Sequence, residues 1–269
     1  GIGVFPRLGL AGAAIATVIS RVFTLVAALW VLSVRDKMLT LQMPSLRVLL
    51  SDWKDLLHIG IPVSAMNLLT PLFMGIITRF AASYGPGIVA SFGVASRIEM
   101  FALIFFMAFS SVLGPFIGQN TGARLPHRVN GAVKFGHHVS VFWGFLLFAV
   151  FYVFGKHFAA VFSTDSSIIG HTSDYLRIVS ISYGFLGVVL MSTTAFNVLR
   201  KPFSAAVLML LKVFVLFIPF AVIVSSRYGV KGLWTSISAS NIAAGLVAAF
   251  WLRHVLLHNT EHKETDNAQ

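Results

Sequence analysis

The sequence predicts an all-α, polytopic membrane protein, and three observations carry that prediction. Of its 269 residues, 57% are hydrophobic and only 11% are charged, so polar residues are too few to cover a water-soluble globule of this length. The apolar residues form seven runs, each long enough to cross about 30 Å of hydrocarbon as a helix rising about 1.5 Å per residue. These runs do not alternate over about ten residues as barrel strands do, and a helix satisfies its own backbone in lipid.

The sequence predicts seven spans and a short helix in the one long connection between them. The spans cover residues 8–34, 56–82, 88–120, 133–155, 168–199, 203–225 and 229–257. After Pro44-Ser45, the residues Leu46, Leu49, Leu50 and Trp53 recur at helical spacing. This spacing predicts a short helix lying in the membrane interface. A plain loop with Trp53 anchored at the headgroups fits the same residues.

The first and last runs share features that suggest an internal repeat. They open with Gly9-Leu-Ala-Gly and Gly229-Val-Lys-Gly, and they carry Ser20-Arg21 and Ser240-Asn241 at mid-span. General helix packing in lipid through small residues explains the match equally well. If the match is a repeat, one unit holds six helices, as in transporters built from paired lobes. The predicted domains are then the last helix of a preceding lobe (1–34), a cytoplasmic linker (35–55), a complete six-helix lobe (56–257) and a cytoplasmic tail (258–269).

The Lys and Arg residues predict the orientation. The connections after spans one, three and five and the C-terminal tail hold Arg35, Lys37, Arg47, Lys54, Arg124, Arg128, Lys134, Arg200, Lys201, Arg253 and Lys263. The opposite side holds only Arg7, Arg79, Lys156, Arg177, Arg227 and Lys231. By the positive-inside rule the C-terminus is expected in the cytoplasm. We therefore expect an integral protein of the bacterial inner membrane.

Several short motifs, taken in order, resemble one transporter family. They are Gly9-x-x-Gly-Ala-Ala-x-Ala-Thr, His58-Ile-Gly-Ile-Pro, Gly114-x-x-x-Gly-Gln-Asn-x-Gly-Ala and Leu199-Arg200. The order is similar to that of helices six to twelve in the multidrug and toxic compound extrusion (MATE) family. The resemblance implies a secondary antiporter of two six-helix lobes that exports organic cations or other amphiphiles in exchange for protons or sodium. It implies no cofactor beyond the coupling ion, and it makes a first lobe and membrane lipid the partners.

The sequence departs from one branch of that family. That branch carries two carboxylates in the second lobe, and the corresponding positions here are about Thr70 and Val189. Neither side chain carries a charge. The resemblance therefore leaves the cation site of this half unassigned, and coupling through an acidic residue of the first lobe stays open.

Glu99 is the only acidic residue well inside a predicted span. A charge at mid-bilayer costs about 2.5–3.5 kcal/mol on insertion scales and is a functional candidate for that reason. Glu99 lies about 17 Å deep from the outer end of its helix, at about 1.5 Å per residue, and Asn67 on the preceding helix lies about as deep. We expect the two to be able to face each other across the cavity. The competing interpretation is a neutral, hydrogen-bonded acid that fixes packing.

Two further polar residues complete the candidate site. Tyr183 and Lys212 lie within spans and are predicted to contribute to ion or substrate binding, although helix–helix hydrogen bonding for Tyr183 and snorkelling or pairing for Lys212 compete with that role. Arg97 lies two residues from Glu99, about 200° around the helix, and so is not its same-face partner.

Other function classes find little support. Most of the nine His residues are scattered over both sides of the membrane, which argues against an enzyme. No glycine loop for nucleotide phosphates, no filter loop of a channel and no basic run for nucleic acid is present. The chain has no Cys. The open alternative is a flippase for a lipid-linked or polysaccharide precursor on a related two-lobe fold, in which Arg21, Arg97 and Lys212 serve a pyrophosphate headgroup.

Overall fold

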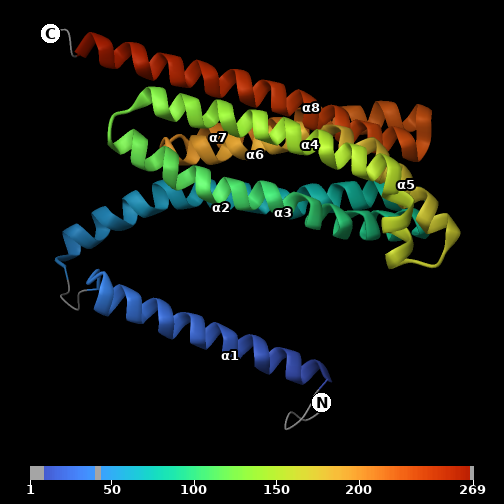
Figure 1. Cartoon of the computed structure of the whole chain (residues 1–269), viewed down its shortest axis with the longest axis horizontal. Coiled ribbons are helices and arrows are strands. Elements are labelled where there is room, and N and C mark those ends of the chain that lie inside the picture. The colour runs from blue at the N-terminus through green and yellow to red at the C-terminus, as the bar shows by residue number, and fades with distance from the viewer. Residues whose placement is uncertain (1–8, 40–43, 267–269) are drawn as a thin grey trace. The chain divides into compact units, whose positions relative to one another are not determined.

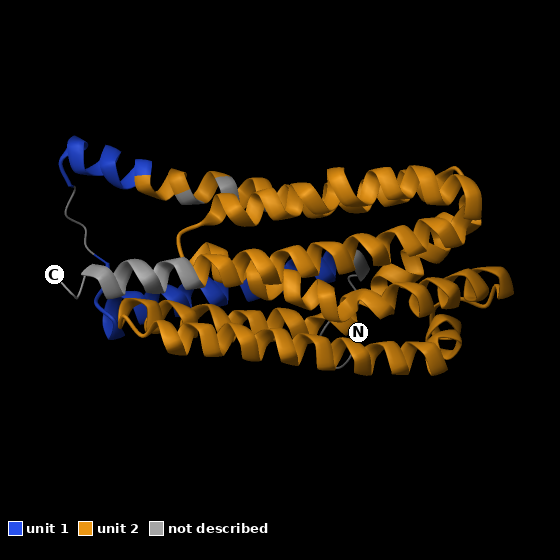
Figure 2. Ribbon diagram, turned by 90° about the horizontal axis from the view of Figure 1, so that it is seen from above, with its two compact units in different colours: residues 1–54 blue, residues 55–269 orange. Residues whose placement is uncertain are grey.

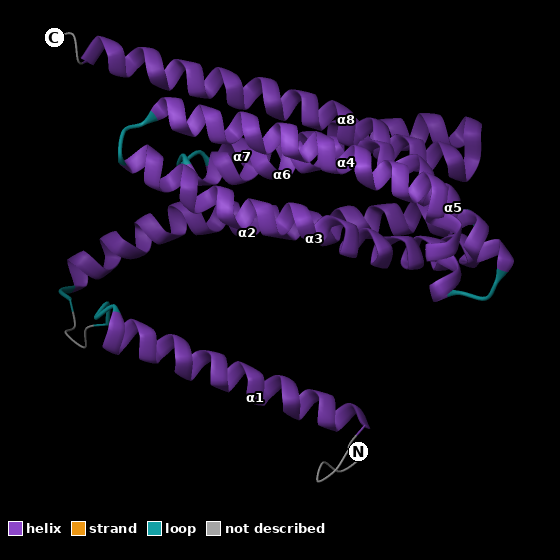
Figure 3. Ribbon diagram, viewed as in Figure 1, coloured by secondary structure: helices purple, strands orange, loops and turns teal. Residues whose placement is uncertain are grey.

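The computed structural model describes the backbone of residues 9–39 and 44–266, and the side chains of residues 11–39 and 44–256 other than 59, 62 and 66. Within these ranges the chain is helical apart from short connections, and no strand occurs in them (Figure 3). The all-α prediction is confirmed. The chain divides into two compact units, Gly1–Lys54 and Asp55–Gln269 (Figure 2).

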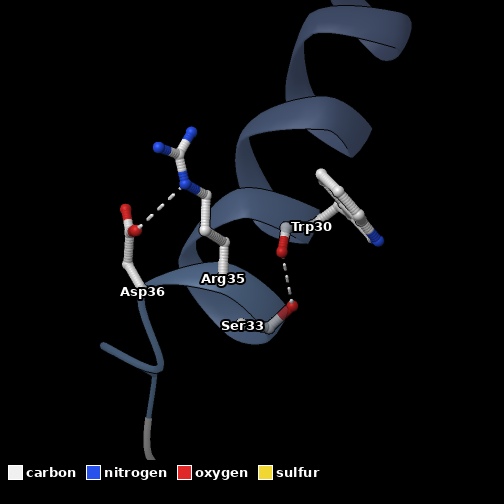
Figure 4. Close-up of polar contacts among 4 residues, drawn as sticks. All are labelled: Trp30, Ser33, Arg35 and Asp36. Atoms are coloured by element: carbon white, nitrogen blue, oxygen red, sulfur yellow. Dashed lines mark hydrogen bonds and ion pairs between the residues drawn. The ribbon is translucent and has the colours of Figure 1, made fainter.

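The first unit is built around one apolar helix. Helix α1 (Gly9–Trp30) widens at its end into a π-turn, η1 (Val31–Arg35). The Ser33 hydroxyl donates to the Leu29 and Trp30 carbonyls at 2.6 and 3.4 Å, and Arg35 pairs with Asp36 at 3.9 Å (Figure 4). These contacts end the helix where the charged linker begins. Most large apolar side chains of α1 are exposed within the unit, as expected of a lipid-facing or protein-facing span.

The second unit is a bundle of long helices (Figure 1). Its elements are α2 (Leu46–Ala82), which begins in the first unit, α3 (Pro86–Gly122), α4 (Pro126–Phe162), α5 (Ser166–Val179), η2 (Ser180–Ser182), α6 (Tyr183–Val198), α7 (Pro202–Leu210), η3 (Leu211–Phe217) and α8 (Ile218–Asp266). Proline occupies the first turn of α3, α4 and α7, where its fixed φ suits a helix start and its missing N–H costs nothing.

The seven predicted spans are all present. Six stretches of the described chain are long and apolar enough to cross a membrane, and the last runs from Pro202 to Leu256. Gly229 breaks that stretch with φ 59° and ψ −140°, a conformation that glycine adopts without strain. Just after the break, Gly232 lies so close to the Val224 carbonyl that any Cβ would collide with it. The chain therefore turns back on itself, and α8 holds parts of two spans.

The structure differs from the predicted boundaries in two places. The helix expected in the linker begins at Leu46, but it continues without interruption into the second span, so α2 has 37 residues. At the other end, the predicted solvated tail begins at 258, whereas α8 runs on to Asp266. In both places the residues next to the apolar run contain no proline or glycine to stop the helix. Residues 267–269 lie outside the described part.

Helix α6 is the centre of the second unit. It contacts α3, α4, α7 and α8, and its side chains are among the most buried of the protein. The crossing with α4 is close because Gly144 faces Gly184, and a Cβ on Gly144 would strike the Gly184 backbone. Small residues that let backbones approach are typical of helix packing in lipid. This close crossing fixes α6, which carries Tyr183 of the candidate site.

Candidate functional site

Glu99 lies on α3, with its side chain half-buried in the bundle. The Tyr175 hydroxyl of α5 donates a hydrogen bond to Glu99 Oε2 at 2.8 Å. Ile98 beside it is 5% exposed, whereas Arg97 is exposed. Arg97 makes no ion pair with Glu99, as the helical angle predicted. The carboxylate of Glu99 is thus held by a neutral donor and not by the nearest arginine.

The two tyrosines near Glu99 are placed by a change of helix type. Asp165 caps α5 by accepting from the Ser167 and Ile168 N–H groups at 2.8 and 3.4 Å. The helix tightens into the 3₁₀ turn η2, where Ser182 accepts from Asn241 Nδ2 of α8 at 2.9 Å. Tyr183, directly after this turn, is completely buried. Its hydroxyl interacts with the Glu99 charge.

Lys212 enters the same interior from η3. This π-turn precedes Pro219, which has no N–H to continue the ordinary hydrogen-bond ladder, and π-turns are frequent at functional sites. Lys212 is only 5% exposed, and its ammonium lies 5.1 Å from the centre of the Phe73 ring of α2. The charges of Lys212 and Glu99 interact. No ion pair within 4.0 Å joins the two in the described structure.

Aromatic rings line the interior next to Glu99. Phe92 stacks on Trp234 at 6.0 Å, and Tyr175 meets Trp234 edge-on at 5.0 Å. Beside Lys212, the rings of Phe73 and Phe217 meet edge-on at 4.9 Å. Ring faces of this kind attract cations, by about 0.5–2 kcal/mol when the cation is desolvated. The arrangement combines one carboxylate, one ammonium and several ring faces in a largely apolar interior.

The structure brings three of the four predicted residues together. Tyr183 and Lys212 each interact with Glu99, but the Asn67 side chain is exposed on α2 and has no contact with Glu99 among the described residues. Equal depth in the membrane does not fix the rotation of a helix about its axis. Sequence reasoning missed Tyr175 and Phe73. Tyr175 could have been found as Tyr183 was, because each carries a polar hydroxyl inside an apolar span.

Other polar groups of the described structure form no comparable site. No cluster of three His, Asp or Glu side chains suited to a metal occurs among the described residues. His137 of α4 is hydrogen-bonded to Ser192 of α6 at 3.0 Å, and Ser110 to Thr194 at 2.6 Å, so these pairs join helices. A cavity of about 50 Å³ lies elsewhere, lined by Thr121, Arg124, Leu125, Pro126, Val129, Leu199 and Leu256.

A bundle of membrane-length helices with charged groups inside is the architecture of a membrane transporter, and comparisons with known proteins agree. The MatE family model matches residues 62–223. The chain belongs to this family, the MATE transporters, and the recognition made from sequence is confirmed.

Individual relatives extend the likeness over most of the chain. The FAD transporter of Shewanella oneidensis is 35% identical over 252 residues, which are 94% of this chain and 56% of that protein. A probable multidrug resistance protein of Bacillus subtilis, YpnP, is 25% identical over 256 residues, 94% of this chain and 56% of that one. The crystal structure of the Vibrio cholerae MATE transporter VcmN in the bent form superposes with a TM-score of 0.84 at 29% identity, covering 94% of this chain and 57% of VcmN. The chain thus spans little more than half the length of these relatives.

Proposed function

We propose that this chain supplies the second six-helix lobe, and the last helix of the first lobe, of an antiporter that exports organic cations or other small amphiphiles in exchange for protons or sodium. The observation that carries the proposal is Glu99, a carboxylate inside a membrane-length helix and held by Tyr175 at 2.8 Å. Such a charge is costly in lipid and is kept where a cation or a proton occupies it.

The exchange follows from charge balance. In a low-dielectric interior Glu99 is stable when protonated or when a cation lies beside it, and unstable when ionised and alone. A cationic cargo and a proton therefore compete for one carboxylate. If the site opens to one side of the membrane at a time, that competition couples the two fluxes in opposite directions.

The remaining parts of the proposal concern partners and location. The relatives in which this chain covers 56% of the length support a partner lobe that closes the second wall of the cavity. The surplus of Lys and Arg in one set of connections supports a cytoplasmic C-terminus, and the bacterial relatives support the bacterial inner membrane. Membrane lipid surrounds the bundle, and no cofactor other than the coupling ion takes part.

The direct test is Glu99→Gln in the intact two-lobe transporter. Glutamine keeps the shape and accepts the Tyr175 hydrogen bond but cannot ionise, so efflux of a fluorescent cation should fall at least about tenfold, which corresponds to about 1.4 kcal/mol. Asp174→Asn, at a partly exposed acidic residue of α5 that pairs with Lys231, is the matched control and should leave efflux unchanged. Efflux by Glu99→Gln at the wild-type rate, with the same pH dependence and membrane level, would assign Glu99 a packing role.

A second candidate cargo is an anionic aromatic molecule of the flavin dinucleotide class. The Shewanella relative is named an FAD transporter, and the ammonium of Lys212 with nearby ring faces suits such a molecule. The same assay separates the candidates. A flavin cargo should be lost in Lys212→Met and spared in Glu99→Gln, whereas a cationic cargo requires Glu99.

A further inference from the structure

Lys212 is the one charged side chain that is fully buried in the described structure. Its ammonium makes no hydrogen bond and no ion pair among the described residues, and its described contact is the Phe73 ring at 5.1 Å. An aromatic ring attracts a cation, but it has no net negative charge and cannot neutralise the cation as a carboxylate does. Lys212 is therefore a buried cation without a fixed anionic partner.

The acidic group whose charge interacts with Lys212 is Glu99. The two charges interact across the interior although they are not joined within 4.0 Å. The other titratable groups facing them are Tyr175 of α5 and Tyr183 of α6, both neutral donors near Glu99. From α2, only the Phe73 ring is described against Lys212. The interior thus holds one acid and one base that balance each other.

A carboxylate that exchanges cations must be compensated while no cargo is bound, because an unpaired charge in an apolar interior is unfavourable. A sodium ion serves that purpose in a site built only of oxygen ligands. Here a cation is already part of the chain. We propose that Lys212 is the resident cation of the Glu99 site, so that the site neither needs nor binds sodium and the exchanged ion is a proton.

The proton balance is simple. Without cargo, ionised Glu99 and protonated Lys212 sum to zero charge. A monovalent cationic cargo at Glu99 would raise that sum by one, so the Lys212 ammonium releases one proton to the open side and becomes neutral. The reverse steps take up one proton and release the cargo. Glu99 and Lys212 titrate as a coupled pair, so the exchanged proton is assigned to the pair and not to either group alone.

This inference rests on the proposed function, and sodium binding tests it without a transport assay. A ligand that binds only the folded state raises the melting temperature. The intact transporter is purified in detergent at about pH 7 and melted in sodium chloride and in potassium chloride of equal concentration. Wild type should melt at the same temperature in both salts. Lys212→Met and Lys212→Gln should melt at least about 3 °C higher in sodium, because Glu99 then lacks its resident cation. Glu99→Gln combined with Lys212→Met should lose that difference.

The outcomes separate the two claims. Sodium stabilisation of wild type, or no sodium stabilisation of either Lys212 variant, overturns the resident-cation assignment. If neither variant yields folded protein, the wild-type comparison decides, with equal melting temperatures supporting the assignment and a sodium shift overturning it. The proposed function fails on a different result, wild-type efflux by Glu99→Gln, in which sodium plays no part.

Discussion

The second unit contains two acid–lysine combinations that differ in burial and in pairing. Asp174 of α5 and Lys231 of α8 lie at the protein surface, with 34% and 69% of their side chains exposed, and form an ion pair at 3.3 Å. Glu99 and Lys212 lie in the interior, and no ion pair joins them within 4.0 Å. The surface charges cost little free energy because water solvates them, and they are paired. The interior charges are costly to remove from water, and no ion pair joins them. Stability alone does not explain the second arrangement, since a pair of apolar residues would serve it better.

The largest effect is expected where the interior carboxylate loses its donor. Tyr175→Phe removes the hydrogen bond to Glu99 and leaves the aromatic packing on Trp234 in place. Hydrogen bonds to charged groups contribute about 1.5–3 kcal/mol, so efflux should fall about tenfold with a changed pH dependence. Tyr228→Phe, which removes a hydroxyl from a tyrosine exposed at the surface, is the matched control. Equal losses in the two variants would show that the Tyr175 bond has no special role.

The smallest effect is expected at the surface pair. Asp174→Asn should lower the unfolding free energy by less than about 1 kcal/mol, because exposed pairs are screened by water and salt. The loss should shrink further when sodium chloride is raised to about 1 M, where the screening length is about 3 Å. Denaturant unfolding in mixed micelles measures both. A loss of several kcal/mol that persists in high salt would contradict the contrast drawn between the two pairs.

The sequence predicted the outlines of this arrangement but not its contacts. Hydropathy located all the spans, and the cost of charge in lipid singled out Glu99 and Lys212. The partners Tyr175 and Phe73 were missed. The expected contact between Asn67 and Glu99 is not among the described contacts, because depth along a helix says nothing of its rotation. The 3₁₀ turn Ser180–Ser182 and the π-turn Leu211–Phe217 orient Tyr183 and Lys212. Such local changes of winding depend on tertiary packing and leave no trace in hydropathy.

Proton release on cargo binding tests the central claim most directly, that Glu99 is the group at which a cation is exchanged for a proton. A cationic cargo is added to the purified intact transporter in weakly buffered, sodium-free detergent solution containing a pH indicator. Wild type should release about one proton per monovalent cation bound, and by linkage the cargo should bind more weakly as pH falls. Glu99→Gln should release none. Undiminished proton release by Glu99→Gln, at wild-type cargo affinity, would contradict the account and place the exchange elsewhere in the transporter.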